Sequence, residues 1–186
     1  MPDAAPKSSD DVLHVWFEET EPRQWFSKDP AFDRRLRDRF IVLTRQAVAA
    51  ELTSWGEAPS SGLALALLLD QFPRQIWRDT AMAFAGDAQA LALSLAAMER
   101  GWIEAEADQA RRQFWLMPRM HSEDLAIQDA AIPLFERFTD PRTTAFAARH
   151  RDVIARFGRF PHRNAILGRV CTAEELAFLQ TPGSGF

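Results

Sequence analysis

The sequence predicts an all-α protein built as one domain. Strand signals are nearly absent: valine and isoleucine are sparse, tyrosine is missing and no useful stretch alternates apolar and polar residues. Helix signals recur along the chain, as capping residues followed by apolar residues three or four positions apart. With 186 residues, 47% of them hydrophobic, the chain can bury a single core. We expect about seven to nine antiparallel packed helices.

The first long helix is predicted to begin at Asp29 and Pro30, a capping residue followed by a first-turn proline. Its apolar residues fall at steps of three and four, which predicts one buried stripe: Phe32, Leu36, Phe40, Leu43 and Ala47. We expect this helix to end near Trp55 and Gly56.

The second helix is expected to open at Pro59 and to end before Pro73, since a residue before proline disfavours the α conformation. Its residues from Leu63 to Leu69 are apolar on every face, as in a helix at the centre of a bundle. Asp87 is expected to cap a third helix that ends at Gly101 and buries Leu91, Leu95 and Met98.

Further helices are predicted over 108–116, which stops before Pro118, and over 122–138, capped by Ser122 and kinked or divided at Pro133. The next runs from Asp140 to a stop at Gly158, and the last follows a capping box from Thr172 to Glu175. No linker divides the chain. We expect one helical domain over residues 10–180, with frayed ends at 1–9 and 181–186.

Charge and cysteine content exclude several classes of protein. The chain has a net charge of −4, although the segment 142–169 carries seven arginines against one acidic residue, Asp152. A dedicated nucleic-acid binder is usually basic, and the isoelectric point here is about 5.6, so no nucleic-acid partner is expected. Cys171 is the only cysteine, which excludes an intramolecular disulfide and suits a reducing cytoplasm. The longest apolar run, Leu63–Leu69, is too short to span a membrane.

Asp70 ends the most apolar helix and is followed by Arg74 and Arg78. A carboxylate in such a position is expected to be desolvated and to need a cationic partner. It would then serve as a base or would orient a ligand. The alternative is an internal strut at a helix C-terminus, where the arginines satisfy the last carbonyl oxygens.

The segment PRMHSED (118–124) contains His121 and Glu123. Ser122 as a helix cap explains the serine and the acidic residues, but it leaves the histidine unexplained. Just outside a helix N-terminus, His121 is expected to have a lowered pKa and to stay neutral, as suits a base. The alternative is a satisfied structural donor.

The segment RFGRFPHRNAILGR (156–169) is rich in hydrogen-bond donors. Arg159, His162, Arg163 and Asn164 fall within six residues. The arginine fork suits a carboxylate or phosphate, which predicts a pocket for a small anionic molecule. The alternative is a helix terminator at Gly158 followed by a short turn, with arginines stacked on phenylalanines.

Metal binding is a further alternative, in which His121, Glu123, His150 and His162 converge with Asp70. Their spacing matches no established ligand motif, and nearby arginines repel a cation, so we expect no metal and no cofactor. Cys171 lacks a neighbouring histidine in the sequence and is expected to be an inert thiol.

The motifs LLLDQFPRQIWR, MHSEDLAIQ and RFGRFPHRNAILGR resemble those of a widespread bacterial family known only as a domain of unknown function. The resemblance extends to DVLHVWFEE, WFSKDPAFD and TAEELAFL, and so covers residues 10–180. It implies a tetratricopeptide-like array of antiparallel helix pairs and brings no activity or catalytic set. The sequence itself shows no clean 34-residue repeat.

Two hypotheses of different class follow. In the first, a pocket binds a small anionic molecule through Arg74, Arg159, Arg163, Asn164 and His150. Proton transfer in that pocket would fall to Asp70, His121, Glu123 and His162. The residues do not name a reaction. In the second, the helical array is a scaffold that binds a protein partner's peptide in a groove, by analogy with other helical arrays.

Overall fold

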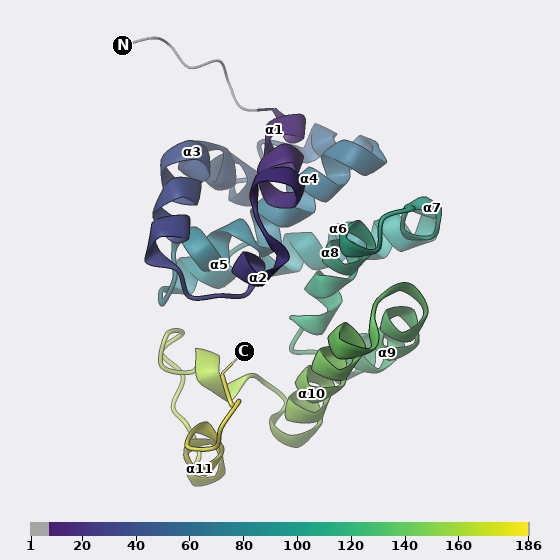
Figure 1. The fold of residues 1–186 in the computed structure, drawn as a ribbon. Coiled ribbons are helices and arrows are strands. Elements are labelled where there is room, and N and C mark those ends of the chain that lie inside the picture. The colour runs from purple at the N-terminus through teal and green to yellow at the C-terminus, as the bar shows by residue number, and fades with distance from the viewer. Residues whose placement is uncertain (1–7, 186) are drawn as a thin grey trace.

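The computed structural model describes residues 8–185, which form helices and no strand (Figure 1). The α-helices are α1 (Ser9–His14), α2 (Pro22–Trp25), α3 (Pro30–Val48), α4 (Pro59–Asp70), α5 (Phe72–Ile76), α6 (Asp87–Glu99), α7 (Trp102–Ala105), α8 (Gln109–Met120), α9 (Leu125–Phe138), α10 (Pro141–Phe157) and α11 (Ala173–Leu179). Between them lie the π-helical segment η1 (Val15–Glu19) and the 3₁₀ segments η2 (Thr53–Glu57), η3 (Ala81–Phe84) and η4 (Pro161–Arg163). The prediction of an all-α protein is confirmed. The helices beyond the expected seven to nine are the short ones, α2, α5 and α7.

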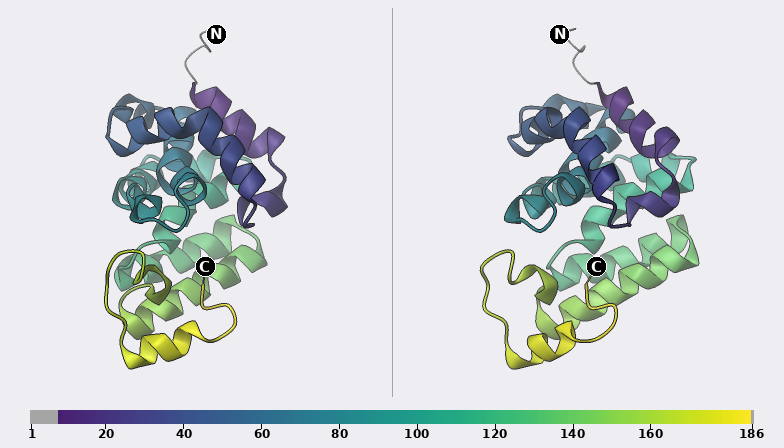
Figure 2. Two further views of the ribbon diagram at one scale, coloured as in Figure 1. Left: turned by 90° about the vertical axis from the view of Figure 1, so that its left-hand side faces the viewer. Right: turned by 60° about the vertical axis from the view of Figure 1, so that its left-hand side comes forward.

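The chain progresses from one end of the molecule to the other. Helices α1, α3, α4 and α5 form the N-terminal end, α6 and α8 cross the middle, and α9, α10 and α11 form the opposite end (Figures 1 and 2). Helix α4 contacts α1, α3, α5, α6 and α8, which explains why it is apolar on every face. Helix α8 also packs on α9, which in turn packs on α10. The C-terminal end of α8 therefore lies between the two ends of the molecule.

Several predicted helix ends are confirmed because local chemistry determines them. Asp29 accepts hydrogen bonds from the first-turn amides of α3, and the stripe from Phe32 to Ala47 is buried. Asp140 caps α10 in the same way, and Gly158 ends it in the left-handed conformation with a φ of 68°. Thr172 forms the predicted capping box with Glu175.

Other predicted ends are wrong. Helix α3 stops at Val48, well before Trp55, because Ala50 adopts a positive φ of 60°. Helix α8 continues through Pro118 to Met120, and α9 passes through Pro133 as one helix. Both prolines lie in helices that pack closely on each other, and this packing offsets the hydrogen bond that each proline removes. Phe72 is helical despite the proline after it.

The buried face of α6 also differs from the prediction. Ala90, Ser94 and Ala97 are buried, whereas Leu91, Leu95 and Met98 are only partly buried. Small residues let α6 approach α8 closely, and the Ser94 hydroxyl donates a hydrogen bond of 2.6 Å to the carbonyl oxygen of Trp115. Asp87 is the first residue of α6, and Gly86 occupies the cap position.

An aromatic cluster forms the core of the N-terminal end. The ring of Trp16 lies 5.4 Å from the rings of Phe72 and Phe114, measured between centroids, and Trp25 stacks on it at 6.3 Å. His14, which the sequence suggested as a packing residue, instead points outward, with 63% of its side chain exposed. The apolar residues on either side of it, Leu13 and Val15, supply the packing.

Gly86 permits the close contact between α6 and α4. A Cβ atom at this position would lie 2.2 Å from the main-chain oxygen of Leu69, which cannot move aside as a side chain can. We expect Gly86→Ala to lower the free energy of unfolding by roughly 2 kcal/mol through overpacking. Urea unfolding followed by circular dichroism measures the loss.

The matched control is Gly158→Ala, whose added Cβ atom meets no atom within 4 Å. We expect this variant to lose only about 1 kcal/mol of unfolding free energy, because alanine is strained in the left-handed conformation. Equal losses in the two variants would show that the α4–α6 contact is looser than described.

One stretch, Ala81–Glu99, passes a length and composition test for a membrane span, with a mean hydropathy of 1.3. It comprises η3 and α6. Helix α6 alone has 13 residues, about 20 Å of helix, whereas the hydrocarbon core of a membrane is about 30 Å thick.

The described residues near the chain ends are held by contacts. Ser9 already lies in α1, Ser184 is buried, and Arg149 donates to the carbonyl oxygen of Gly183 at 3.1 Å. The fraying expected for 1–7 and 186 lies outside the described residues.

Candidate functional site

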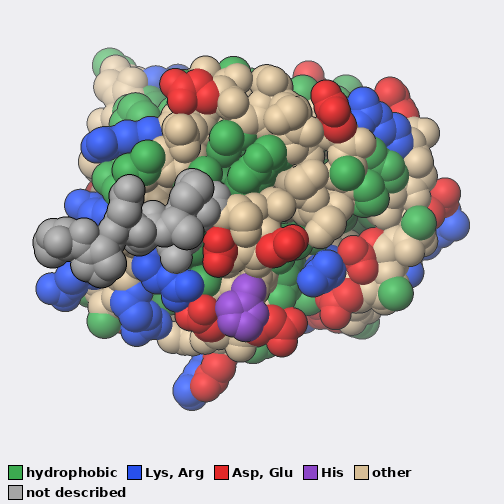
Figure 3. Space-filling model, turned by 90° about the horizontal axis from the view of Figure 1, so that it is seen from above, with side chains coloured by type: hydrophobic (Ala, Val, Ile, Leu, Met, Phe, Trp, Pro, Cys, Tyr) green, Lys and Arg blue, Asp and Glu red, His purple; other side chains and the backbone are tan. Residues whose placement is uncertain are grey.

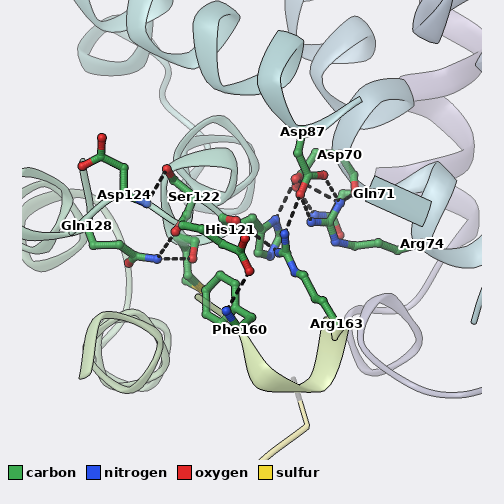
Figure 4. Close-up of polar contacts among 12 residues, drawn as sticks. Asp70, Gln71, Arg74, Asp87, His121, Ser122, Asp124, Gln128, Phe160 and Arg163 are labelled. Carbon is green, nitrogen blue, oxygen red and sulfur yellow. Dashed lines mark hydrogen bonds and ion pairs between the residues drawn. The ribbon is translucent and has the colours of Figure 1, made fainter. Parts of the chain in front are cut away.

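Asp70 lies at the end of α4 with 2% of its side chain exposed. One carboxylate oxygen is 2.7 Å from Nδ1 of His121 and 3.3 Å from Nη1 of Arg74 (Figure 4). Burial opposes ionisation, yet the positive charge of Arg74 and the hydrogen bond from His121 hold the pKa of Asp70 well below its ordinary value. Asp70 is therefore an ionised carboxylate in the interior. The other expected partner, Arg78, pairs with Asp33 instead.

Asp87, at the start of α6, joins two arginines. Its carboxylate accepts two hydrogen bonds from Arg74, at 2.9 and 3.0 Å, and one from Arg163 at 3.0 Å. Arg163 also donates to the main-chain oxygen of His121 at 3.1 Å. Its guanidinium carbon lies 4.5 Å from the ring centroid of Phe84 and 4.6 Å from that of Phe160. Segments far apart in the sequence thus meet at one point.

His121, His150 and His162 gather next to this point. The rings of His121 and His150 are 6.1 Å apart, and Phe160 lies 5.6 Å from both His150 and His162. Burial lowers the pKa of His150 to about 3 and that of His162 to about 4, with Arg163 nearby adding to both effects. Burial also lowers the pKa of His121, although Asp70 opposes this. All three imidazoles are neutral at pH 7.

His121 is neutral, as predicted, but it does not lie at a helix N-terminus. His121 is the C-cap of α8, and Asp124 rather than Ser122 caps α9. The lowered pKa of His121 therefore comes from burial rather than from a helix N-terminus. The Ser122 hydroxyl instead accepts a hydrogen bond from the amide of Asp124 at 3.2 Å.

Glu123 lies beside the site and forms hydrogen bonds that hold the chain after α10. It accepts two hydrogen bonds from Arg169, at 2.6 and 2.9 Å, and one from the amide of Phe160 at 2.7 Å. Burial opposes ionisation, but these donors lower the pKa of Glu123 overall. Glu123 thus anchors the chain after α10 and does not meet Asp70.

Arg159 and Asn164 belong to a second cluster. Arg159 donates to both carboxylate oxygens of Glu175, at 2.6 and 2.8 Å, and to the main-chain oxygen of Val170 at 2.9 Å. Asn164 donates to the sulfur of Cys171 at 3.3 Å. The structure therefore does not bring these two residues to the Asp70 site. It brings together Asp70, Arg74, His121, His150, His162 and Arg163.

Two cavities of the described part of the chain lie away from these residues. One cavity of about 30 Å³ adjoins η1 and α3, and another of about 240 Å³ opens beside Asp10, His14 and Glu18. This second cavity lies on the surface of the N-terminal end, where acidic side chains surround a histidine (Figure 3). No predicted site residue lines either cavity. Among the described residues, no group of three or more histidine, cysteine or acidic side chains is arranged to hold a metal ion.

Two residues of the site were missed in the sequence. Asp87 was explained by its place at a helix start, and Phe84 carried no polar signal. The motifs that contain Asp70, His121 and Arg163 hold more arginines than carboxylates. This excess was the one sign in the sequence that the arginines needed a further acidic partner.

Comparisons with known proteins agree with the predicted resemblance. The model of a family described as bacterial protein of unknown function (DUF924) matches residues 12–183. A solved structure of a protein of unknown function from Agrobacterium tumefaciens, ATU0120, is 41% identical, with a TM-score of 0.86. The match covers 92% of this chain and 96% of that chain. No curated protein matches this chain.

Proposed function

Because the chain belongs to the DUF924 family, whose description names no activity, we propose a function from the site itself. The protein binds a small anionic molecule at Arg74 and Arg163, and the Asp70–His121 pair moves a proton to or from that molecule. The site is smaller than the sequence suggested, since Arg159, Asn164 and Glu123 have other partners.

The observation that carries this proposal is the 2.7 Å contact between Asp70 and His121. Because the carboxylate is ionised, the Nδ1–H of His121 donates to it, and Nε2 keeps its lone pair. A carboxylate that fixes the tautomer of a neutral imidazole is an arrangement found in general bases. The side chain of His121 is 10% exposed and that of Arg74 is 20% exposed, so a small molecule can approach from this side.

Asp87 indicates the kind of ligand. It lies between Arg74 and Arg163 as a planar anion bonded to both guanidinium groups. A carboxylate or phosphate of a ligand offers the same acceptor geometry. Asp87 thus stands where the ligand's anionic group would bind, and ligand binding requires Asp87 to release one or both arginines.

The second candidate function, a peptide-binding scaffold, depends on the tetratricopeptide-like arrangement. Short connections such as the two residues between α9 and α10 support antiparallel helix pairs. The large exposed apolar side chains, however, come from scattered segments: Phe26, Val42, Met82, Leu125, Phe146, Leu167, Val170 and Leu176. No observation singles out a groove, so the anion site remains the leading proposal. We place this activity in the cytoplasm.

Competition with Asp87 can be measured directly. We expect Asp87→Asn to bind inorganic phosphate or citrate about tenfold more tightly than the unmodified protein, a gain of about 1.4 kcal/mol. The uncharged amide no longer competes for the two arginines. Isothermal titration calorimetry at pH 7.5 gives the dissociation constants.

The matched control is Asp33→Asn, which removes the carboxylate of the separate Arg78 pair. It should leave phosphate and citrate binding unchanged. Arg74→Lys in the Asp87→Asn background should weaken binding again, because lysine cannot make the paired contact. Equal affinities in the Asp33→Asn and Asp87→Asn variants, or no binding of either anion to Asp87→Asn, would contradict the proposal.

A further inference from the structure

Gln71 follows Asp70 at the junction of two helices. It is the C-cap of α4 and the N-cap of α5. Its main-chain amide donates to the carbonyl oxygen of Leu67 at 2.9 Å, and its carbonyl oxygen accepts from the amide of Arg74 at 3.1 Å. The residue is only 5% exposed, so its side chain lies in the interior. The fold therefore fixes both the main chain and the surroundings of Gln71.

The side-chain amide of Gln71 donates to the Asp70 carboxylate (Figure 4). Its Nε2 atom lies 2.5 Å from Oδ2 of Asp70 and 3.8 Å from the sulfur of Met117 on α8. An ionised carboxylate only accepts hydrogen bonds, so the nitrogen of the amide, and not its oxygen, must face Asp70. The nitrogen thus has two acceptors, a charged oxygen and a weakly accepting sulfur.

The two oxygens of Asp70 are divided between different partners. His121 and Arg74 contact Oδ1, whereas Gln71 contacts Oδ2. A carboxylate turns easily about its terminal bond, and two partners on the same oxygen do not fix the position of the other. A donor on the second oxygen fixes the plane of the carboxylate. It therefore also fixes the direction in which Oδ1 meets Nδ1 of His121.

The same hydrogen bond favours the ionised form of Asp70. Burial raises the pKa of this carboxyl, and the bond from Gln71 acts together with His121 and Arg74 to lower it. Gln71 carries no charge, so the negative charge of Asp70 stays available to His121 and Arg74.

We propose that Gln71 is a positioning residue, whose amide holds the Asp70 carboxylate in the orientation that selects the Nδ1–H tautomer of His121 and leaves the lone pair on Nε2. This inference rests on the proposed function, in which the Asp70–His121 pair moves a proton. Gln71 acts only through Asp70.

The tautomer of His121 can be measured by nitrogen-15 NMR, because the protonated and unprotonated nitrogens of a neutral imidazole have well-separated chemical shifts. The His121 signals are those absent from His121→Gln. At pH 7.5, without added anion, we expect the Nδ1–H tautomer in the unmodified protein. Gln71→Leu removes the donor and keeps a similar size. It should lower the ratio of the Nδ1–H to the Nε2–H tautomer at least about tenfold, because a hydrogen bond to a charged group is one of the stronger kind.

The matched control is Gln75→Leu. Gln75 is also 5% exposed, but its amide donates to the main-chain oxygen of Trp25 at 3.0 Å. This variant should lose stability and keep the tautomer ratio of His121. Equal falls of the ratio in the two variants would show general loosening of the core, and an unchanged ratio in Gln71→Leu would overturn the proposal.

The unmodified protein provides a second test that needs no variant to fold. The side-chain amide protons of Gln71 should exchange with water at least about 100-fold more slowly than those of the exposed Gln109. They should also show a nuclear Overhauser effect to the methyl group of Met117. Exchange as fast as in Gln109 overturns the proposal.

Failure of this inference can be told apart from failure of the proposed function. If His121 carries its proton on Nε2 in the unmodified protein, the proposed base is wrong, and the role of Gln71 falls with it. If the Nδ1–H tautomer is present and persists in Gln71→Leu, only the role of Gln71 is wrong.

Discussion

Replacing Asp70 by asparagine is expected to lower the free energy of unfolding by roughly 3–5 kcal/mol, the usual cost of breaking a buried ion pair from one side. Asparagine has nearly the same shape, so the loss reflects charge rather than packing. Arg74 would lose one of its two carboxylate partners, and His121 would lose the acceptor that fixes its tautomer. Urea unfolding followed by circular dichroism at pH 7.5 measures the difference.

The matched control for this variant is Asp129→Asn. Asp129 pairs with Arg151 at 2.6 Å, a distance similar to the Asp70–His121 contact, but both side chains lie on the surface. Exposed pairs contribute about 0–1 kcal/mol, so the control should unfold almost as the unmodified protein does. A loss below about 1 kcal/mol for Asp70→Asn would contradict a buried, ionised Asp70.

Acid should destabilise the protein at an unusually high pH. The pKa values of His150 and His162 are lowered in the folded state, so the unfolded chain binds more protons once the pH falls below about 6.5. Stability from these groups is fully present above that pH and is lost progressively towards pH 4 and 3. At pH 5 the loss is about 2 kcal/mol for His150 and less for the partly exposed His162, together roughly 3 kcal/mol.

Urea unfolding at pH 7.5, 6 and 5 checks this expectation. Carboxylates change the stability only at lower pH. The pKa values of Asp70, Glu123 and Glu175 are lowered in the folded state, so their contribution to the free energy of unfolding is lost only below about pH 4.5. A fall in the free energy of unfolding between pH 6.5 and pH 5 is therefore caused by protonation of histidine. His14→Gln should leave it unchanged, whereas a stability that stays flat to pH 5 would show that His150 and His162 are not buried as neutral groups.

The parts of the fold that the sequence predicted well depend on local chemistry. Asp29, Asp140 and Thr172 cap their helices by bonding to amides two or three residues away, so a short window of sequence contains the whole interaction. The wrong predictions depend on distant segments. Continuation of α8 through Pro118 and the small-residue face of α6 depend on the packing of α8 against α9 and against α6, which no local pattern records.

The candidate site shows the same division. Asp70, His121 and Arg163 were each identified as unusual in their own segments, and the structure brings them together across 51 and 42 residues of sequence. Arg159 and Asn164 were grouped with Arg163 because they are close in the chain. The turn of η4 directs them elsewhere, to Glu175 and Cys171. Proximity in sequence therefore overestimated the size of the site.

The bond between Asp87 and Arg163 joins residues separated by 76 positions. During synthesis the N-terminal helices can pack as they emerge, because their contacts lie within the first part of the chain. Asp87 must therefore wait for Arg163 until the residues between them have also emerged. A nascent chain that stops before Arg163 therefore carries packed N-terminal helices with an incomplete polar site, and the emergence of Arg163 supplies the missing bond.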